Sequence, residues 1–415
     1  MVGLLLIGTP IFVILLVVAL VALFLSDVTP NMAQTVIFGS LGNFPLLAIP
    51  FFILAGEIMG SGGIARRLVN WVLSLIGGVR GSLGIATIVS SELFGAMSGS
   101  AVGTLAAVGQ LLFPALRSSG YDNRFAVSLI TSSGAIAIVI PPSIAMIIYG
   151  ITAQVPLKSL FIAGILPALF IGVIDIAYVL YYAHSHKIAV QPKDPERSAW
   201  QATKDAAWAL GTIVVIFGGI YGGVFTATEA AGVAVFYSAF VAKFIYREVS
   251  WKDLWTISTR ATMLTAQILL IVAGAGLFSW MLTTNGIASR IVDGIIAMHA
   301  GPAATLLFMN LTLLLAGSFL EPPAAILILV PLFLPVGAKL GVDPIHFGVI
   351  FAVNLSLGMY MPPFGLNIFA ANMIFKRPLG EIYAGVVPFL IINFFALMVI
   401  TYVPQLSMAL VHLLH

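Results

Sequence analysis

The stretch that decides the fold runs from residue 82 to residue 116 and reads SLGIATIVSSELFGAMSGSAVGTLAAVGQLLFPAL. It is almost entirely apolar, with Glu92 as its one charged residue. About 20 helical residues cross the hydrocarbon core of a bilayer, so this stretch is too long for one plain span. Gly95-Ala-Met-Ser-Gly-Ser100 interrupts it near the middle. A long apolar segment with such a break predicts a re-entrant helical hairpin, which enters and leaves the membrane on one side.

Three further segments are interrupted in the same manner. Segment 302–336 is broken by Gly317-Ser-Phe-Leu-Glu-Pro-Pro323 and predicts a second hairpin. The other two segments each contain a Pro-Pro pair, and proline removes a backbone donor and clashes with the preceding turn. Each of them therefore predicts a helix broken into two halves. They are 125–150, with Pro141-Pro142, and 346–373, with Pro362-Pro363.

Composition assigns the rest of the chain to the membrane as well. Its 415 residues are 60% hydrophobic and 8% charged, with a mean hydropathy of +1.12. A soluble protein of this length cannot cover itself with so few polar groups. Plain apolar segments lie near 3–25, 44–60, 160–183, 207–224, 228–246, 262–282 and 381–406. The first of these lacks a basic leading region and a small-residue cleavage site, so we interpret it as a retained span. The fold class is an all-α polytopic membrane protein.

The two halves of the chain are related by an internal duplication. With one offset of 221, residues that dictate backbone geometry come into register. The pairs are Pro114 with Pro335, Gly120 with Gly341, Asp122 with Asp343, Pro141 with Pro362, Gly164 with Gly385, and Pro167 with Pro388. Glycines and prolines count for more here than shared leucines, because their positions are tied to particular turns.

The distribution of charge indicates that the two repeats have opposite orientations in the membrane. The polar stretch 184–205 and the basic loop 243–260 are joined by two spans, so both lie on one side, and their Lys and Arg residues mark it as cytoplasmic. The first half then ends in the cytoplasm and the second half begins there. This topology places every Lys and Arg on the cytoplasmic side except Lys158, Arg290 and Lys339. Parallel repeats would not give this one-sided distribution.

The predicted domains follow from these elements. They are an N-terminal span and connector (1–43), a first inverted repeat (44–183), a cytoplasmic connector with two scaffold spans (184–260), a second inverted repeat (261–406) and a C-terminal tail (407–415).

Interrupted helices are tolerated inside a membrane only where their freed backbone groups meet protein, water or an ion. Four breaks that meet at mid-membrane would offer helix N-termini to an anion and bare carbonyls to a cation. The polar candidates near the breaks are Ser98, Ser100, Thr104, Thr131, Ser132, Ser133, Ser318, Asn354 and Ser356. Hydroxyl and carbonyl oxygens are hard ligands that suit Na⁺. Two related sodium sites are predicted.

We assign substrate binding to residues at the first hairpin tip and in both broken helices. They are Ser98, Gly99, Thr131, Ser132, Ser133, Asn354 and Asn367. The alternative is that the small residues merely allow close helix packing, as the row Gly95, Gly99 and Gly103 would. A serine in such a helix can equally bond back to the backbone.

Acids inside a membrane are costly, so each is a functional candidate. Glu321 follows the second hairpin tip and could tune the site or a gate, whereas Glu57 and Asp175 are expected to pair with a tryptophan, a serine or another subunit. Glu229 belongs to the capping-box pattern Thr226-Ala-Thr-Glu229. No arginine is expected near any break, so helix dipoles and hydroxyls would have to meet the charge of a substrate.

Several classes of protein are excluded. The chain has no cysteine, which rules out disulfides and thiolate metal sites. It contains no H-E-x-x-H motif, no G-x-S-x-G nucleophile elbow and no P-loop, so enzymatic chemistry and ATP-driven transport by this chain are not expected. The net charge of +3 is explained by topology and does not indicate nucleic-acid binding.

Four motifs carry a resemblance to a known family. They are Gly95-Ala-Met-Ser-Gly-Ser-Ala-Val-Gly-Thr104, Ile140-Pro-Pro-Ser143, the run from Gly218 to Ala231, and Met361-Pro-Pro-Phe-Gly365. Together they resemble the large membrane subunit of tripartite ATP-independent periplasmic (TRAP) transporters, and the likeness covers essentially the whole chain. The resemblance implies a multi-pass protein of the bacterial inner membrane that imports carboxylates, such as C4-dicarboxylates, sialic acid or other sugar acids, with Na⁺.

The resemblance also implies partners and a mechanism. A soluble periplasmic binding protein would deliver the substrate, and a small four-helix membrane subunit would complete the complex in the bilayer. The hairpins and broken helices would move as an elevator-type transport domain against a scaffold formed by the other spans and the small subunit. No small-subunit segment is present in this sequence, so a separate chain is expected.

The resemblance further implies one sodium site, formed by Ser318 and the backbone of Gly358, Tyr360 and Pro363. Applying the offset of 221 places a mirror site at Ala137, Val139 and Pro142. The hairpin tips would complete the two sites, with Ser100 in the first half and Gly317 in the second.

Three other functions stay open at this point. The nearest is a stand-alone Na⁺/dicarboxylate symporter, which would need neither a binding protein nor a small subunit. A non-transporting scaffold or channel and an intramembrane enzyme are the others, although the sequence offers no nucleophile paired with a base.

Overall fold

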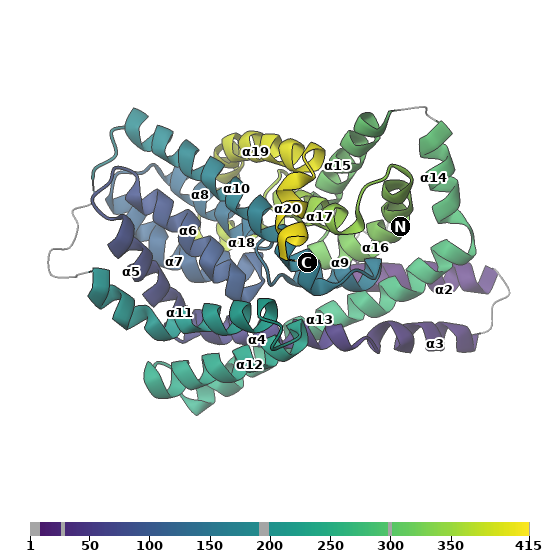
Figure 1. The fold of residues 1–415 in the computed structure, drawn as a ribbon, viewed down its shortest axis with the longest axis horizontal. Coiled ribbons are helices and arrows are strands. Elements are labelled where there is room, and N and C mark those ends of the chain that lie inside the picture. The colour runs from purple at the N-terminus through teal and green to yellow at the C-terminus, as the bar shows by residue number, and fades with distance from the viewer. Residues whose placement is uncertain (1–8, 26–29, 191–198, 298–300, 415) are drawn as a thin grey trace.

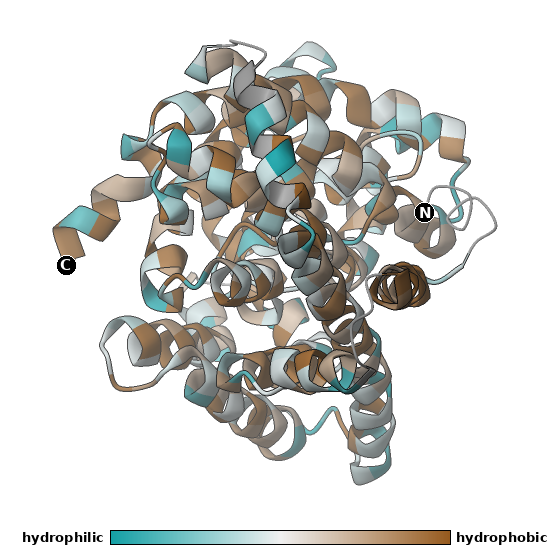
Figure 2. Cartoon of the chain, turned by 90° about the vertical axis from the view of Figure 1, so that its right-hand side faces the viewer, coloured by the Kyte–Doolittle hydropathy of each residue, from teal (hydrophilic) through white to brown (hydrophobic). Residues whose placement is uncertain are grey.

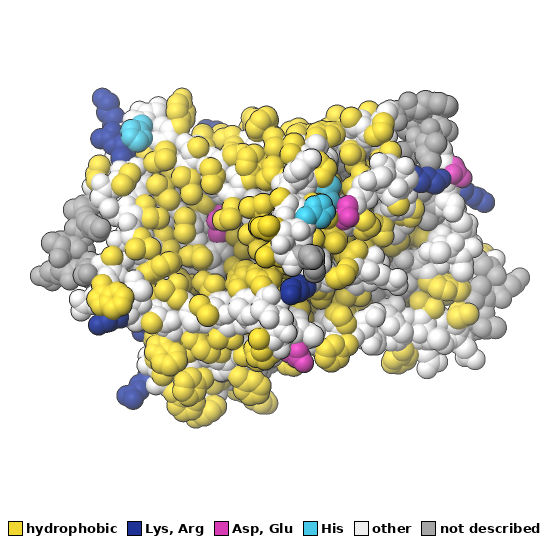
Figure 3. Space-filling model, in the orientation of Figure 1, with side chains coloured by type: hydrophobic (Ala, Val, Ile, Leu, Met, Phe, Trp, Pro, Cys, Tyr) yellow, Lys and Arg dark blue, Asp and Glu magenta, His cyan; other side chains and the backbone are white. Residues whose placement is uncertain are grey.

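The computed structural model describes residues 9–25, 30–190, 199–297 and 301–414, and its described secondary structure is helical throughout (Figure 1). Nine helical segments in these ranges are long and apolar enough to cross a membrane. The prediction of an all-α polytopic membrane protein is confirmed. Figure 2 shows hydrophobic residues on most helices, and Figure 3 shows a face covered largely by hydrophobic side chains, with Lys and Arg gathered mostly toward its edges.

The first predicted hairpin consists of helices α6 (Ser82–Ser98) and α7 (Ala101–Ser118), which pack side by side. Gly99 turns the chain between them with a φ of 61°, a left-handed conformation that glycine adopts without a steric penalty. Ser100 then caps α7, because its Oγ accepts a hydrogen bond from the Gly103 N–H at 3.2 Å. The tip of this hairpin is therefore a tight turn formed by two residues.

The second hairpin consists of α15 (Pro302–Phe319) and α16 (Pro322–Lys339), joined by Leu320 and Glu321. Helix α16 begins with two prolines, whose missing N–H groups would have no partner in a first helical turn anyway. The two hairpin tips thus differ chemically: α7 begins with free backbone donors, whereas α16 begins with prolines behind an acid.

Both predicted broken helices are observed. The first consists of α8 (Asn123–Ile136) and α9 (Ile144–Ala153), and the second of α17 (Pro344–Gly358) and α18 (Leu366–Phe375). A Pro-Pro pair lies in each break, and its peptide bond is cis in both. The first break is almost entirely buried by neighbouring helices, whereas Pro363 and Phe364 in the second break are exposed.

The helices of the two halves exchange partners in a reciprocal manner. The second arm of the first hairpin, α7, packs against α18 from the other half, where Phe113 and Phe375 have ring centroids 4.8 Å apart. The second arm of the second hairpin, α16, packs against α9. Long helices α10 (Leu157–Ser185) and α19 (Leu379–Tyr402) follow the two broken helices. A twofold relation between the halves would produce this packing, and their inverted orientation in a membrane stays a prediction.

The remaining helices surround this central group. They are α2 (Ile11–Leu25), α3 (Pro30–Leu41), the turn η1 (Phe44–Leu47) with α4 (Ala48–Ser61), α5 (Ile64–Ile76), α11 (Ala199–Tyr221), α12 (Ala227–Phe240) with the π-helix η2 (Val241–Ile245), α13 (Trp251–Thr284), α14 (Ile287–Ala297) and α20 (Gln405–Leu414). Helix α4 packs against both α12 and α13, and the three form one wall beside the hairpins (Figure 1).

The boundaries differ from the sequence-based expectation in three places. Residues 30–41 form a helix within the expected connector, and residues 405–414 form α20 where a tail was expected. The sequence predicts a basic loop over 243–260, but the second part of this stretch is helical, because α13 begins at Trp251. Parts of the predicted segments, residues 3–8, 191–198 and 415, lie outside the described residues.

A capping box explains the early start of α13. The Ser250 Oγ accepts from the Asp253 N–H at 3.1 Å, and the Asp253 carboxylate accepts from the Ser250 N–H at 2.8 Å. The two residues satisfy free donors at the first turn of the helix, which stabilises a helix start in a polar stretch.

The capping box predicted at Thr226 is confirmed. The Glu229 N–H donates to the Thr226 Oγ1 at 3.3 Å, and the Thr226 N–H donates to the Glu229 carboxylate at 2.8 Å. We expect Thr226→Ala to lower the free energy of unfolding by about 1 kcal/mol, because it removes one half of this box. Thermal melting in detergent would measure the loss. Thr262→Ala, at an exposed site inside α13, is the matched control, and an equal loss in both variants would contradict the capping role.

Candidate transport site

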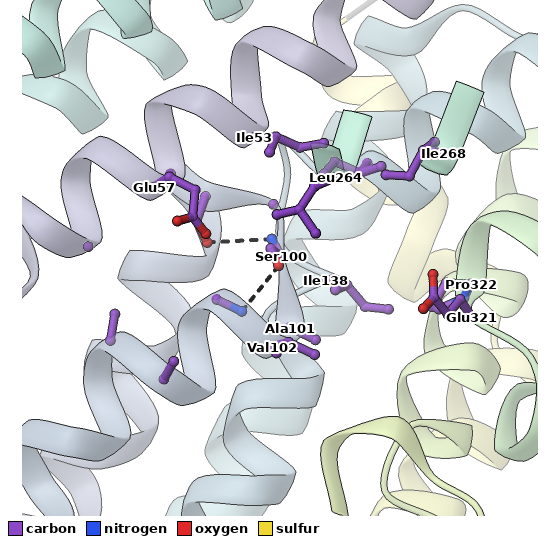
Figure 4. Close-up of a pocket in the computed structure, with 18 of the residues that line it drawn as sticks. Ile53, Glu57, Ser100, Ala101, Val102, Ile138, Leu264, Ile268, Glu321 and Pro322 are labelled. Atoms are coloured by element: carbon purple, nitrogen blue, oxygen red, sulfur yellow. Dashed lines mark hydrogen bonds between the residues drawn. The ribbon is translucent and has the colours of Figure 1, made fainter. Parts of the chain in front are cut away.

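A cavity of about 510 Å³ lies where all four interruptions meet (Figure 4). The first hairpin contributes its tip at Ser98, Gly99 and Ser100, and the second contributes the start of α16 at Glu321. Both breaks reach the same cavity, through Ile138 and Ile144 from the first and Met359 and Leu366 from the second. Helices α4 and α13 complete the lining.

Each hairpin tip packs against a break of its own half. A Cβ atom placed on Gly358 would lie 2.5 and 2.6 Å from the backbone carbonyl carbon and Cα of Gly317, a separation that real side chains do not reach. In the first half, Gly95 and Ala137 approach each other in the same manner. Gly358 and Ala137 are equivalent under the offset of 221, so the two halves repeat the contact between tip and break.

The structure places the candidate sodium residues behind the cavity wall, at these two contacts. Gly317 and Ser318 end α15 beside Gly358, and the Ser318 hydroxyl donates to the Leu315 carbonyl at 2.8 Å. Tyr360 and Pro363 lie in the break that follows. The mirror residues Ala137, Val139 and Pro142 lie in the first break, while Ser100 lies on the cavity side of the first tip.

The candidate substrate residues fall into three groups, of which the asparagines form the last. Ser98 and Gly99 line the cavity together with Ser100. Thr131, Ser132 and Ser133 are buried inside α8, and each donates its hydroxyl hydrogen to a backbone carbonyl one turn earlier, so they do not reach the cavity.

The two asparagine candidates bridge elements instead of lining the cavity. Asn354 donates to the Asn310 side chain at 2.7 Å, which joins α17 to α15. Asn367 donates to the backbone carbonyl of Thr131 at 3.2 Å, which joins the two broken helices. Both side chains are fully buried. They hold the broken helices in place around the cavity.

The expectation that no arginine lies near the breaks is wrong. Arg260 lines the cavity from α13, and its Nη1 lies 3.6 Å from the Oε2 of Glu57 on α4. Within this chain, Glu57 therefore pairs with an arginine and not with the predicted tryptophan or serine; its pairing with another subunit stays a prediction. The pattern of Ser250 and Asp253 was the missed signal, because a helix that starts at 251 carries residue 260 about 14 Å along its axis.

A second cluster of polar side chains lies next to the break that follows α17. Asp175 on α10 is fully buried, and the Asn393 Nδ2 donates to its Oδ2 at 3.4 Å. The same Nδ2 donates to the Tyr360 hydroxyl at 2.9 Å. Glu92 lies close to Asp175. A Cβ atom on Gly172, one helical turn before Asp175, would collide with the Glu92 carboxylate. The sequence identifies Asp175 as a costly acid but does not reveal Asn393 as its partner.

The described part of the chain has nine helical segments long enough to span a membrane. Two helical hairpins and two broken helices meet around one cavity. This arrangement is that of a secondary membrane transporter. The chain belongs to the DctM component family of the tripartite ATP-independent periplasmic transporters, whose family model matches residues 1–406. It is thus a large permease subunit of the bacterial inner membrane. Relatives in this family carry the names of transport permeases and not of enzymes.

Two relatives show how closely the chain follows the family. The C4-dicarboxylate TRAP transporter large permease protein of Pseudomonas aeruginosa is 40% identical over 89% of this chain and 86% of its own length. The sialic acid TRAP transporter large permease protein of Vibrio cholerae is 34% identical over 98% of this chain and 96% of its own length. Among solved structures, the YdaH transporter of Alcanivorax borkumensis has a TM-score of 0.66 at 14% identity and covers 94% of this chain and 96% of its own, which shows a shared fold.

Proposed function

We propose that this chain imports a small carboxylate with Na⁺, after a periplasmic binding protein has delivered the substrate. The observation that carries the proposal is the meeting of all four helix interruptions at one cavity. Interrupted helices place backbone carbonyls and helix termini where an ion and an acid can use them, which an uninterrupted bundle cannot do. The names of the two relatives support a carboxylate as cargo.

The sodium sites of this proposal lie at the two contacts between hairpin tip and break. At the second contact, Gly317 and Gly358 bring the end of α15 against the end of α17, and the Gly317 carbonyl oxygen would lie 3.0 Å from a Cβ on Gly358. Carbonyl oxygens at helix C-termini carry partial negative charge and suit a cation. The equivalent contact at Gly95 and Ala137 supports a second site.

The proposed mechanism is an elevator in which the hairpins and broken helices move against the wall of α4, α12 and α13. This division follows the packing, because α7 with α18 and α16 with α9 tie the four interrupted elements into one group. A separate small four-helix membrane subunit would extend the wall. Sodium would favour the carboxylate-bound group by neutralising charge before it moves.

The test is uptake into proteoliposomes that contain this chain and its small subunit, with the binding protein outside. We expect accumulation of succinate or N-acetylneuraminate, and only when an inward sodium gradient and all three components are present. Uptake by the chain alone with free substrate would favour a stand-alone Na⁺/dicarboxylate symporter instead. Absence of uptake and of any sodium effect under every condition would contradict a coupled transporter.

Ser318→Ala tests the sodium site directly. If the Ser318 oxygen is a ligand, its loss should raise the sodium concentration needed for half-maximal thermal stabilisation by about tenfold, which corresponds to one lost ion contact of about 1.4 kcal/mol. Melting curves in NaCl and KCl at matched ionic strength would measure the shift. Ser407→Ala, at a buried serine on α20 outside the cavity, is the control and should leave the sodium response unchanged.

A further inference from the structure

The wall formed by α4 and α13 carries an ion pair that the proposed sodium coupling does not use. Arg260 and Glu57 both line the cavity, and their closest charged atoms are 3.6 Å apart. The Arg260 side chain keeps 63% of its surface exposed, whereas that of Glu57 keeps 23%. Within the described residues that line the cavity, Arg260 is the one Lys or Arg.

This pair lies beside the tip of the first hairpin. Gly56, the neighbour of Glu57, packs so closely on the tip that a Cβ there would come 3.0 Å from the Cβ of Ser98. In Figure 4, Glu57 and Ser100 lie on one side, and Glu321 and Pro322 lie across the cavity from them. An acid that enters between the two hairpin tips therefore meets Arg260 on the scaffold wall.

The geometry of the pair leaves the guanidinium available. At 3.6 Å the contact is an ion pair that is too long for a hydrogen bond. A guanidinium has five donors in a planar fork that matches a carboxylate, and a bidentate contact to carboxylate is stronger than a single long ion pair. Because the Arg260 side chain is largely exposed, the long ion pair contributes little to stability and opens at small cost.

We propose that Arg260 binds the carboxylate of the transported substrate, and that Glu57 is the internal carboxylate which the substrate displaces. The inference rests on the proposed carboxylate transport and adds to it the residue that recognises the acid. Exchange of one carboxylate for another keeps Arg260 paired throughout, so the guanidinium never loses its counter-ion. Glu57 returns to Arg260 when the substrate leaves, and it thereby competes with rebinding.

This role predicts that substitutions of the two partners change the affinity for the carboxylate in opposite directions. Glu57→Gln removes the competitor, so the carboxylate should bind about threefold to tenfold more tightly. Arg260→Gln removes the binding group, so binding should weaken by about tenfold or more, and Arg260→Lys should fall between, because lysine keeps the charge but not the fork. An ion pair that only holds α4 to α13 would give losses of the same sign in both variants.

The experiment uses the full chain purified with its small subunit, in a constant sodium concentration. Succinate and N-acetylneuraminate are the probes, and the readout is the concentration of each that gives half of the maximal thermal stabilisation. The pair formed by Arg66 and Glu248 outside the cavity has nearly the same exposure, 55% and 24%, so Arg66→Gln is the matched control and should change neither probe. The melting temperature without probe shows whether each variant is folded.

Opposite shifts for Glu57→Gln and Arg260→Gln support the inference. Shifts in the same direction, no shift, or a wild-type chain that responds to sodium but to neither carboxylate would overturn it. If Arg260→Gln does not fold, tighter binding by Glu57→Gln still decides the question, since a structural pair cannot produce it. Failure of the proposed function is separate, because it would remove the effect of sodium itself.

Discussion

Gly358→Ala is expected to abolish sodium-dependent stabilisation and to lower the free energy of unfolding by about 1–3 kcal/mol, the usual cost of overpacking. The added Cβ would lie 2.5 Å from the carbonyl carbon of Gly317, which is backbone and cannot rotate away. The end of α15 must then move off the end of α17, which separates the carbonyl oxygens assigned to Na⁺. Melting curves with and without sodium, together with sodium-driven uptake, measure both effects.

Two control variants sharpen this prediction. A Cβ on Gly232 in α12 would meet nothing within 4 Å, so Gly232→Ala should behave like the wild type. Gly95→Ala should reproduce the loss in the first half, because its Cβ would collide with Ala137. A Gly358→Ala chain with an unchanged melting temperature and an unchanged sodium response would falsify the assignment of the site to this contact.

Asn393→Leu is expected to cost on the order of 2 kcal/mol of folding free energy, although leucine has a similar size. Asn393 donates to both the Asp175 carboxylate and the Tyr360 hydroxyl, and all three residues are fully buried. Without the amide, the Asp175 carboxylate and the Tyr360 hydroxyl each lose a hydrogen bond that they accept, and a buried polar group that loses a partner carries a desolvation cost. Thermal or denaturant unfolding of the purified chain measures the loss.

A double-mutant cycle separates the lost hydrogen bonds from a change in packing. Asp175→Leu combined with Asn393→Leu should lose less than the sum of the two single variants, since removing both partners leaves fewer groups unsatisfied. Strictly additive losses would show that Asn393 acts through packing. Sodium affinity is a second readout, because Tyr360 lies in the break assigned to the second sodium site and a tilt of its ring would move that segment.

The interruptions were predictable from the sequence because they are local. Gly99 requires a left-handed φ and Pro141-Pro142 cannot continue a helix, whatever surrounds them. The predicted hairpins 82–116 and 302–336 accordingly match α6 with α7 and α15 with α16 to within a few residues. The same reasoning does not locate side chains: Thr131 stands fewer than two turns before a break, yet its hydroxyl bonds back within α8.

Arg260 shows what local reasoning misses. It was assigned to a cytoplasmic loop by counting charges, but α13 starts early and carries it to the cavity. Its partner Glu57 lies in the other half of the sequence, and Asn393 lies 218 residues from Asp175. Such pairs depend on which helices become neighbours, and a single sequence carries no signal for that.

The membrane class and the four interruptions follow from the sequence alone, because hydropathy, glycine and proline act on the nearest turns of the backbone whatever the rest of the chain does. Only the tertiary structure decided that the interruptions share one cavity, that Gly317 meets Gly358, and that Arg260 faces Glu57 beside the first tip. These contacts join segments far apart in the chain, and they form only when long helices pack at particular registers that no local rule specifies.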